Sequence, residues 1–263
     1  MSKQILIYRR LEVQHANAMP AWWFLAPPSP TSFVGFGQAL ALKCIPKDQQ
    51  KSFLGVSIVF HEHEFLAEKL KSNLSPHQFR AASFVDEQDY ADRVSLSMQP
   101  TARCRMTVSV AVVFDEDAEI DDYAVEAFSH GARIAGGEIV NPQDPARGEK
   151  ISDFREAAQT GFGVHLRSDL MEPLPGEDRL DALLRATRPD HDTRKENPWV
   201  MPALLGYAQI TNFAIRGNSR ESLPHAFVEP LIGLIQLKSV RQEPDLPVWS
   251  YQRPHERAFT VGY

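Results

Sequence analysis

A run of alternating, β-branched residues at positions 103–114 constrains the fold of this chain more than any other feature. The run reads RCRMTVSVAVVF, and this composition is typical of a strand in a sheet with a buried face. Residues 4–13 (QILIYRRLEV) and 54–66 (LGVSIVFHEHEFL) are similar apolar segments that we also expect to be strands. Three such segments in the first part of the chain predict a β-sheet at the centre of the fold.

Helical patterns lie between and after these strands. Apolar residues from Phe33 to Cys44 recur at helical spacing, and Thr31 or Ser32 is the expected N-cap. An acidic run at 115–122 follows the 103–114 strand, and acidic residues are favourable at a helix N-terminus. We therefore expect a second helix over about 121–134, with Tyr123 and Ile134 on its apolar face.

A short strand at 136–142 (GEIVN within GGEIVNP) completes the order strand, helix, strand, strand, helix, strand. This order predicts an α+β fold with a ferredoxin-like split unit over about 1–142, which is also the framework of RNA-recognition domains. We expect a single domain over 1–263, with 143–263 as an inserted or accessory region. The fold alone does not identify a function, because unrelated proteins share it.

The expected elements of the second half are less regular. They are a helix at 152–160, a strand at 161–166, a helix at 177–187, a polar loop at 188–198, an apolar segment at 198–210 broken by Pro202, a helix within 221–240 that begins near Pro224 or Pro230, and a strand-like tail.

Composition excludes several classes of protein. The formal net charge is −6, which disfavours a free-standing nucleic-acid binder of broad affinity and leaves room only for a local basic groove. The chain has no apolar run of about 18 residues and no secretory signal, so we expect a cytoplasmic protein. Cys44 and Cys104 lie far apart, which favours neither a disulfide framework nor a zinc site.

Arginines in the expected strands are the most informative polar residues. Arg9 and Arg10 are consecutive in a strand, so one of the two is expected to point inward or toward a partner. Arg103 and Arg105 alternate on the central strand and should share one face. The guanidinium group binds phosphate and stacks on bases, and the amides of Gln14 and Asn17 can read base edges.

No motif for catalysis or cofactor binding is present. His61 and His63 lie two apart on a strand, but no third ligand with metal-type spacing accompanies them, so we expect neither a metal nor a cofactor. The chain lacks a nucleophile elbow, a phosphate-binding loop and a zinc-protease motif. An enzyme would have to use a histidine such as His61 or His130 as a general base.

Several segments, taken in order, carry a resemblance to a known family. They are RRLEVQHANA, the proline-serine-proline loop with SFVGFGQAL, GVSIVFHEHEF, RMTVSVAVVF, ARIAGGEIV, GFGVHL, PWVMPALLGY, FVEPLIGL and VWSY. Together they span essentially the whole chain, and none of them is catalytic. The sequence resembles the family of second subunits of the type I-F CRISPR Csy (Cascade) complex.

The resemblance implies a modified RNA-recognition domain with a thumb-like insertion and a role in antiviral defence. Members of the family bind the 5′ handle of the guide RNA and dock the large subunit and the first backbone subunit, while recognition of target DNA, which lies nearby in the complex, is left to base pairing. By position, the residues implied to contact or shape the handle site are Arg9, Arg10, Gln14, Asn17, Ser29, Phe33, Phe36, Arg103, Arg105, Arg133, Gly136 and Gly137. The implied role is non-catalytic.

Two other functions remain open from the residues. One is a repeat-RNA endoribonuclease of the same superfamily that uses His61 or His130. The other is a ferredoxin-like metabolic enzyme with a deep pocket and no affinity for RNA.

Overall fold

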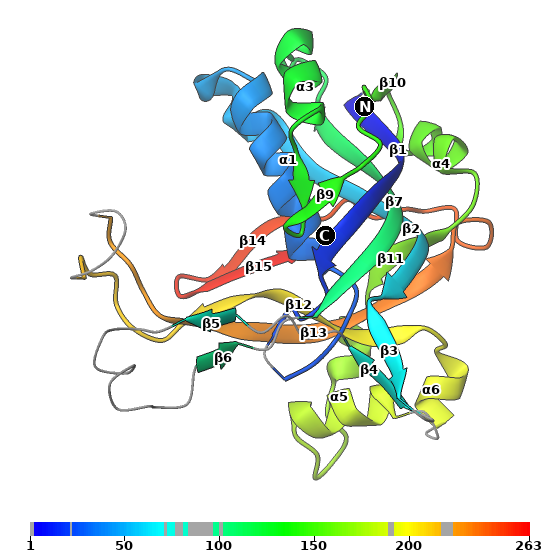
Figure 1. The fold of residues 1–263 in the computed structure, drawn as a ribbon, viewed down its shortest axis with the longest axis vertical. Helices are drawn as coiled ribbons and strands as arrows, with labels where there is room; N and C mark the ends of the chain where they lie inside the picture. The colour runs from blue at the N-terminus through cyan, green and yellow to red at the C-terminus, as the bar shows by residue number, and fades with distance from the viewer. Residues whose placement is uncertain are drawn as a thin grey trace.

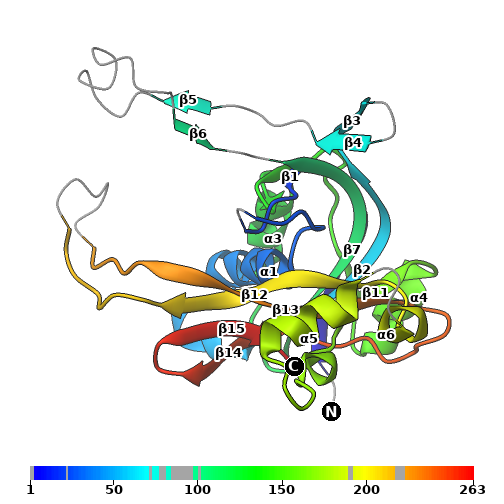
Figure 2. The ribbon, with the colours of Figure 1, turned by 90° about the horizontal axis from the view of Figure 1, so that it is seen from below.

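The computed structural model describes residues 3–21, 23–70, 73–76, 81–83, 97–99, 102–188, 192–216 and 223–263. An 11-stranded sheet runs through it in the order β14-β15-β12-β13-β11-β2-β7-β1-β9-β8, with β10 paired to β1. The sheet curls, so that α1 lies inside the curve between the β1-β7-β2 part and the β12-β13 part (Figure 2). A mixed α+β architecture is therefore confirmed.

The expected strands of the first half form the middle of this sheet. β1 (Lys3–Asn17) pairs antiparallel with β7 (Arg103–Asp115), and β7 pairs antiparallel with β2 (Phe53–Phe65). β9 (Gly137–Ile139) pairs with the far side of β1 and forms a hairpin with β8 (Arg133–Ile134). The strand order in this part of the sheet is β9-β1-β7-β2.

The second half of the chain adds β10 (Ala146–Gly148) beside β1 and extends the same sheet beyond β2. The strands beyond β2 are β11 (Phe162–Leu166), β12 (Val200–Gln209), β13 (Val228–Ser239), β14 (Ser250–His255) and β15 (Ala258–Gly262). β11 joins the two parts, because it pairs with β2 on one side and with β13 on the other.

Two helices cover one face of β1, β7 and β2 (Figure 1). They are α1 (Pro30–Cys44) and α3 (Asp122–Ser129), and their apolar side chains form the main core with Leu6 and Tyr8 of β1 and the facing residues of β7 and β2. Phe36 contacts both Tyr8 and Phe128 edge-on or tilted, at ring-centroid distances of 5.5 and 5.4 Å. Such aromatic pairs add stability beyond the area they bury.

The opposite face of the same strands is covered only in part. α4 (Ile151–Ala158) packs Phe154 and Ala158 against Ile5 and Ile7, together with Val240 and Leu246 from after β13. The covered part is the end of the sheet where β1 begins. The other helical elements of the described residues are η1 (Lys47–Ser52), η2 (Ser168–Met171), α5 (Arg179–Thr187) and α6 (Asp192–Glu196).

Two hairpins between β2 and β7 had no counterpart among the expected elements. β3 (Ala67–Leu70) pairs with β4 (Asn73–Pro76), and β5 (Ala81–Ser83) pairs with β6 (Ser97–Gln99). The β5–β6 hairpin lies away from the main sheet (Figure 2).

Several expected boundaries were wrong. The helix expected within 221–240 is wrong, because residues 228–239 form the strand β13. Pro230 is accommodated because β11 pairs only with the 235–239 part of that strand. The helix expected over 121–134 ends at Ser129, since Ile134 belongs to β8. Tyr123 is 80% exposed and does not lie on its apolar face.

Two further corrections concern helix ends and the polar loop. The N-cap of α1 is Ser29, with Pro30 in the first turn, and not Thr31 or Ser32. The segment 188–198 contains the short helix α6, while 189–191 lie outside the described residues.

Candidate functional site

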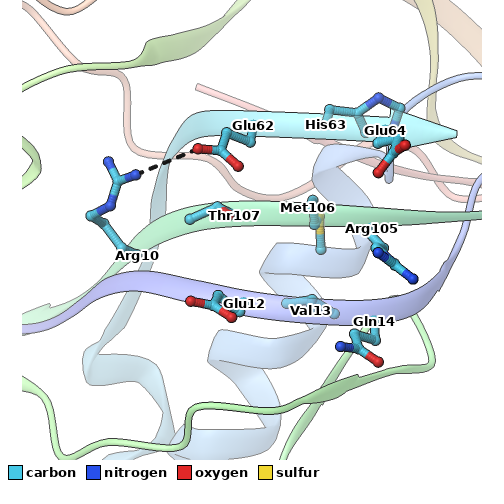
Figure 3. Close-up of a pocket in the computed structure, with 10 residues that line it drawn as sticks. All are labelled: Arg10, Glu12, Val13, Gln14, Glu62, His63, Glu64, Arg105, Met106 and Thr107. Atoms are coloured by element: carbon cyan, nitrogen blue, oxygen red, sulfur yellow. Dashed lines mark ion pairs between the residues drawn. The ribbon is translucent and has the colours of Figure 1, made fainter.

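A polar hollow of about 580 Å³ lies on the second face of β1, β7 and β2, beyond the part that α4 covers (Figure 3). It is lined by Arg10, Glu12, Val13, Gln14, Glu62, His63, Glu64, Arg105, Met106 and Thr107. The three strands therefore carry helices on one face and an open row of polar side chains on the other.

Bulges in β1 make this face polar. Ile5 and Ile7 point toward α4, and Leu6 and Tyr8 point toward α1. The register of β1 on β7 shifts between Tyr8 and Leu11, so the alternation is reset: Leu11 and Val13 point into the helix-covered core, while Glu12 and Gln14 are exposed. A β-bulge inserts one extra residue and has this effect on every residue that follows.

The neighbouring strand β2 has a bulge at the same level. Its register on β7 shifts between Phe60 and Glu62. As a result Phe60 lies in the core, and Glu62 and Glu64 are exposed beside Thr107 and Arg105 of β7. Bulges on both sides of β7 thus turn the same stretch of sheet into a polar face.

The buried hydroxyl of Ser109 holds the two bulges together. It accepts a hydrogen bond from the backbone N–H of Arg10 at 2.9 Å and lies 2.7 Å from His61 Nε2. A third contact closes this network of Arg10, Ser109 and His61, because Arg10 Nη1 lies 3.2 Å from His61 Nδ1. Arg10 has φ 48°, a left-handed conformation that costs free energy in a non-glycine residue and that this network stabilises.

Both histidines of β2 are held neutral. Burial, and then the nearby charge of Arg10, lower the pKa of His61 to about 4. Burial lowers the pKa of His63 to about 4 as well. At neutral pH neither imidazole adds positive charge to the hollow.

Of the two orientations expected for Arg9 and Arg10, inward or toward a partner, the structure excludes the inward one. Both are exposed, and neither points inward, because the two residues form the bulge rather than a regular strand. Gln143 donates to the carbonyl oxygen of Arg9 at 2.7 Å, and Asn141 donates to that of Arg10 at 3.1 Å. The Arg10 guanidinium also lies 3.9 Å from Glu62.

The other polar candidates on the strands divide into two groups. Gln14 and Arg105 line the hollow. Asn17 lies opposite Arg103 at the end of β1, and its side chain bonds the backbone N–H and carbonyl of Met19, so it shapes a turn. Arg103 is half-buried on the same side of β7 as Arg105, but does not line the hollow.

Three candidates from the loop and α1 are buried and do not present side chains to a ligand. Phe33 and Phe36 belong to the main core, and Ser29 is buried at the start of α1, where its hydroxyl lies 2.6 Å from Thr31 Oγ1. Burial excludes direct contact of these side chains with RNA and leaves the role of shaping the handle site as a prediction. They support β1 and β2 from behind.

Arg133, Gly136 and Gly137 lie in the β8–β9 hairpin. Ala135 and Gly136 both have positive φ, as two-residue hairpin turns of the favoured type require. A Cβ on Gly137 would lie 2.7 Å from the carbonyl oxygen of Gln14, so this glycine allows close approach to β1 rather than to a ligand. Arg133 is exposed and donates to the Gly136 carbonyl oxygen at 3.3 Å.

The charges in the polar hollow do not suit simple phosphate neutralisation. Two arginines, Arg10 and Arg105, share it with three glutamates, Glu12, Glu62 and Glu64. Carboxylates accept hydrogen bonds from base amino groups and repel phosphates. The arrangement therefore favours reading a few bases over binding any polyanion.

A second, apolar hollow of about 410 Å³ adjoins the first and was not predicted from the sequence. Its aromatic lining comes from Phe60 and Phe65 of β2, Phe162 of β11 and Trp199 just before β12, and it shares Glu62 and His63 with the polar hollow. The signal that could have pointed to it is the aromatic residue at the edge of each of three apolar segments. Which edges meet depends on the pairing of β11 with β2.

Within the described residues, no group of three or more His, Cys, Asp or Glu side chains comes together as metal ligands do. In the same part of the chain, no helix has the length and apolar character needed to cross a bilayer.

Comparison with known proteins gives one result. No curated protein matches the chain. A model of the family described as CRISPR-associated protein (Cas_Csy2) matches residues 6–259, which include the lining of both hollows and all of the curled sheet except the first residues of β1 and the last residues of β15. The chain therefore belongs to the Csy2 family of CRISPR-associated proteins, and this membership places it in a CRISPR-Cas Csy complex.

Proposed function

We propose that this chain is the non-catalytic subunit of a type I-F surveillance complex that binds the 5′ handle of the guide RNA with the open face of β1, β7 and β2. The observation that carries the proposal is the polar hollow with Arg10, Gln14 and Arg105 on a sheet whose other face is covered by α1 and α3. In RNA-recognition domains a four-stranded sheet binds single-stranded RNA on one of its faces.

The strand order supports a ferredoxin-like unit. In the order β9-β1-β7-β2, β2 comes after α1 in sequence and β9 comes after α3, and these two strands lie at the two ends of the four-strand group. All three neighbouring pairs are antiparallel. We assign this part of the single domain as the split strand-helix-strand unit.

The geometry around His61 supports a non-catalytic role. Its two ring nitrogens face Ser109 and Arg10, and its pKa of about 4 leaves it a weak base at neutral pH. His130 is the C-cap of α3, on the helix-covered side of the sheet. Neither histidine is placed to take a proton from a ribose hydroxyl of an RNA bound in the hollow.

The exposed end of the β12–β13 hairpin supports docking to other subunits. Ile210, Phe213, Ile215, Leu223 and Phe227 are each more than half exposed there, and adjoining apolar patches mark protein interaction sites. We propose that an apolar surface of the large subunit or the first backbone subunit covers them. Target DNA then lies close to this chain only through the assembled complex.

The test of handle binding uses Arg105, because Arg10 also stabilises a bulge. An Arg105→Gln variant, assembled with the other subunits, should bind a guide with its native handle roughly 10- to 100-fold more weakly, the range for losing one charged hydrogen bond. Arg241→Gln, an exposed arginine away from the hollow, is the matched control.

Guides with a scrambled handle should show no difference between the two variants. Equal affinity of both variants for the native handle would remove the basis of the proposal. Metal-independent cleavage of repeat RNA that is lost in His61→Asn would instead establish the endoribonuclease.

A further inference from the structure

We infer that the apolar hollow beside the polar face is a pocket for one unstacked nucleobase of the guide RNA, stacked on Trp199. The inference rests on the proposed handle binding and goes beyond it by assigning a site with aromatic walls. Single-stranded RNA is recognised by splaying a base from its neighbours and stacking it on an aromatic side chain.

Trp199 is held in a strained conformation with its side chain exposed. It has φ 61°, which is rare for a bulky residue, and it is 59% exposed at the edge of the hollow. A strained residue persists only where its surroundings fix it, and such residues cluster at ligand sites.

Three polar side chains fix the backbone around Trp199. Gln236 donates to the carbonyl oxygen of Pro198 at 2.9 Å, and Arg167 donates to both Gln236 and Asn197. The carbonyl oxygen of Trp199 itself accepts from the N–H of Leu237 at 3.2 Å. A half-buried polar network thus holds the backbone that carries an exposed indole. A surface residue without a ligand does not require such a network.

The neighbouring walls of the hollow are also aromatic. The Phe162 and Trp199 rings are 6.3 Å apart between centroids and tilted by 46°, and Phe65 lies against His63 at 4.5 Å, edge to face. Trp199 remains 59% exposed beside these rings, so part of its indole is free for stacking.

A nucleotide fits the two hollows better than an apolar protein side chain does. The hollows share Glu62 and His63 of β2, so an RNA strand with one base in the apolar hollow can continue past β2 and present its next base to the polar hollow. His63 Nε2 is buried and has no hydrogen-bond partner within the described residues, and such groups are costly to leave unpaired. A base edge can supply a partner after a small rotation of the imidazole, whereas a leucine or phenylalanine side chain cannot.

The test compares two substitutions that keep the same backbone strain. Trp199→Leu retains an apolar side chain and removes the stacking surface, whereas Trp199→Phe retains a stacking surface. In the reconstituted complex we expect Trp199→Leu to bind a native-handle guide on the order of 10-fold more weakly, and Trp199→Phe to stay within about 3-fold of the unmodified chain. Equal affinities of the two variants overturn the pocket.

A scan of single abasic sites along the handle then identifies the base. One abasic position should weaken binding to the unmodified chain by as much as Trp199→Leu does, and combining the two changes should cause no further loss, because both remove the same contact. If the effects of Trp199→Leu and every abasic site multiply, Trp199 does not hold a base.

The remaining outcomes separate this inference from handle binding itself. Loss of affinity in Arg105→Gln without any difference between the Trp199 variants overturns the pocket and leaves handle binding standing. A Trp199→Leu defect that is equal for native, scrambled and abasic handles means that a segment of another subunit fills the hollow. If neither Arg105→Gln nor Trp199→Leu changes affinity, handle binding by this face is wrong as well.

Discussion

At the scale of single residues, the Trp199 backbone offers a sharp test of strain. Glycine adopts positive φ without the cost that alanine pays, and Trp199 has φ 61°. We expect Trp199→Gly to be more stable than Trp199→Ala by about 1 kcal/mol, the reverse of the usual order of these residues. Urea unfolding of both variants measures the difference, and a more stable Trp199→Ala would show that the strain is absent in solution.

Protonation of the β2 histidines should weaken the fold in mild acid. His61 and His63 have pKa values of about 4 in the folded chain, against 6.5 for a free imidazole. Between these values the unfolded chain binds more protons, so the free energy of unfolding falls as pH drops from 6.5 toward 4. Urea midpoints at pH 7.5 and 5 should show the drop.

The histidine variants provide the control for this pH dependence. His63→Asn should reduce the loss of stability between the two pH values, because one titrating group is removed. His130→Asn, at an exposed position, should leave it unchanged. A loss of equal size in all three proteins would assign the pH dependence to other groups.

At the scale of elements, two adjacent glycines with different surroundings test how β9 is held on β1. A Cβ at position 137 would meet the Gln14 carbonyl oxygen at 2.7 Å and the Ala16 nitrogen at 2.8 Å. Gly137→Ala should therefore displace β9 and cost about 2–4 kcal/mol of stability. At Gly136 nothing lies within 4 Å of an added Cβ, and its φ of 74° leaves only backbone strain of about 1 kcal/mol for Gly136→Ala. Similar losses for the two variants in chemical unfolding would contradict this account.

The elements predicted best from the sequence are those whose apolar residues recur with one clear period, either that of a strand or that of a helix. The strands at 4–13, 54–66 and 103–114 and the helix over 33–44 are confirmed, because each has a run of apolar residues facing a single core. The prediction of a helix within 221–240 was wrong because the prolines were interpreted as helix starts. The apolar residues from Leu231 to Leu237 are equally typical of a buried strand. Which of the two forms depends on pairing with β12 and β11, which no local pattern records.

The site was predictable in part. Arg10, Gln14 and Arg105 were identified from the sequence and line one hollow. The β1 bulges were not identified. The core-facing residues of a regular strand lie two positions apart, whereas Tyr8 and Leu11 lie three apart, as do Val13 and Ala16. These two wider spacings mark the bulges. The apolar hollow could not be predicted from the sequence, because it depends on the long-range pairing of β11 with β2.

At the scale of the whole molecule, the exposed apolar hairpin end should govern solubility and assembly. Phe213 and Ile215 are 68% and 71% exposed, so replacing both with serine removes little buried area and should change the free energy of unfolding by less than about 0.5 kcal/mol. We expect the double variant to be more soluble alone and to assemble poorly with the other subunits. Leu42→Ser, at an exposed position on α1, is the control, and full assembly of the double variant would show that no subunit covers this surface.

In β1 and β2 the backbone bulges set which positions face outward, and the side chains at those positions set the chemistry of the surface. This separation has a practical consequence. The bulges tied by Ser109 decide that positions 12, 14, 62 and 64 face outward, so the chemistry displayed at those positions is independent of the core beneath. A library randomised at Glu12, Gln14, Glu64 and Thr107 should therefore consist largely of folded proteins. Selection from such a library for guides with altered handles would yield orthogonal complexes that ignore one another's RNA within a single cell.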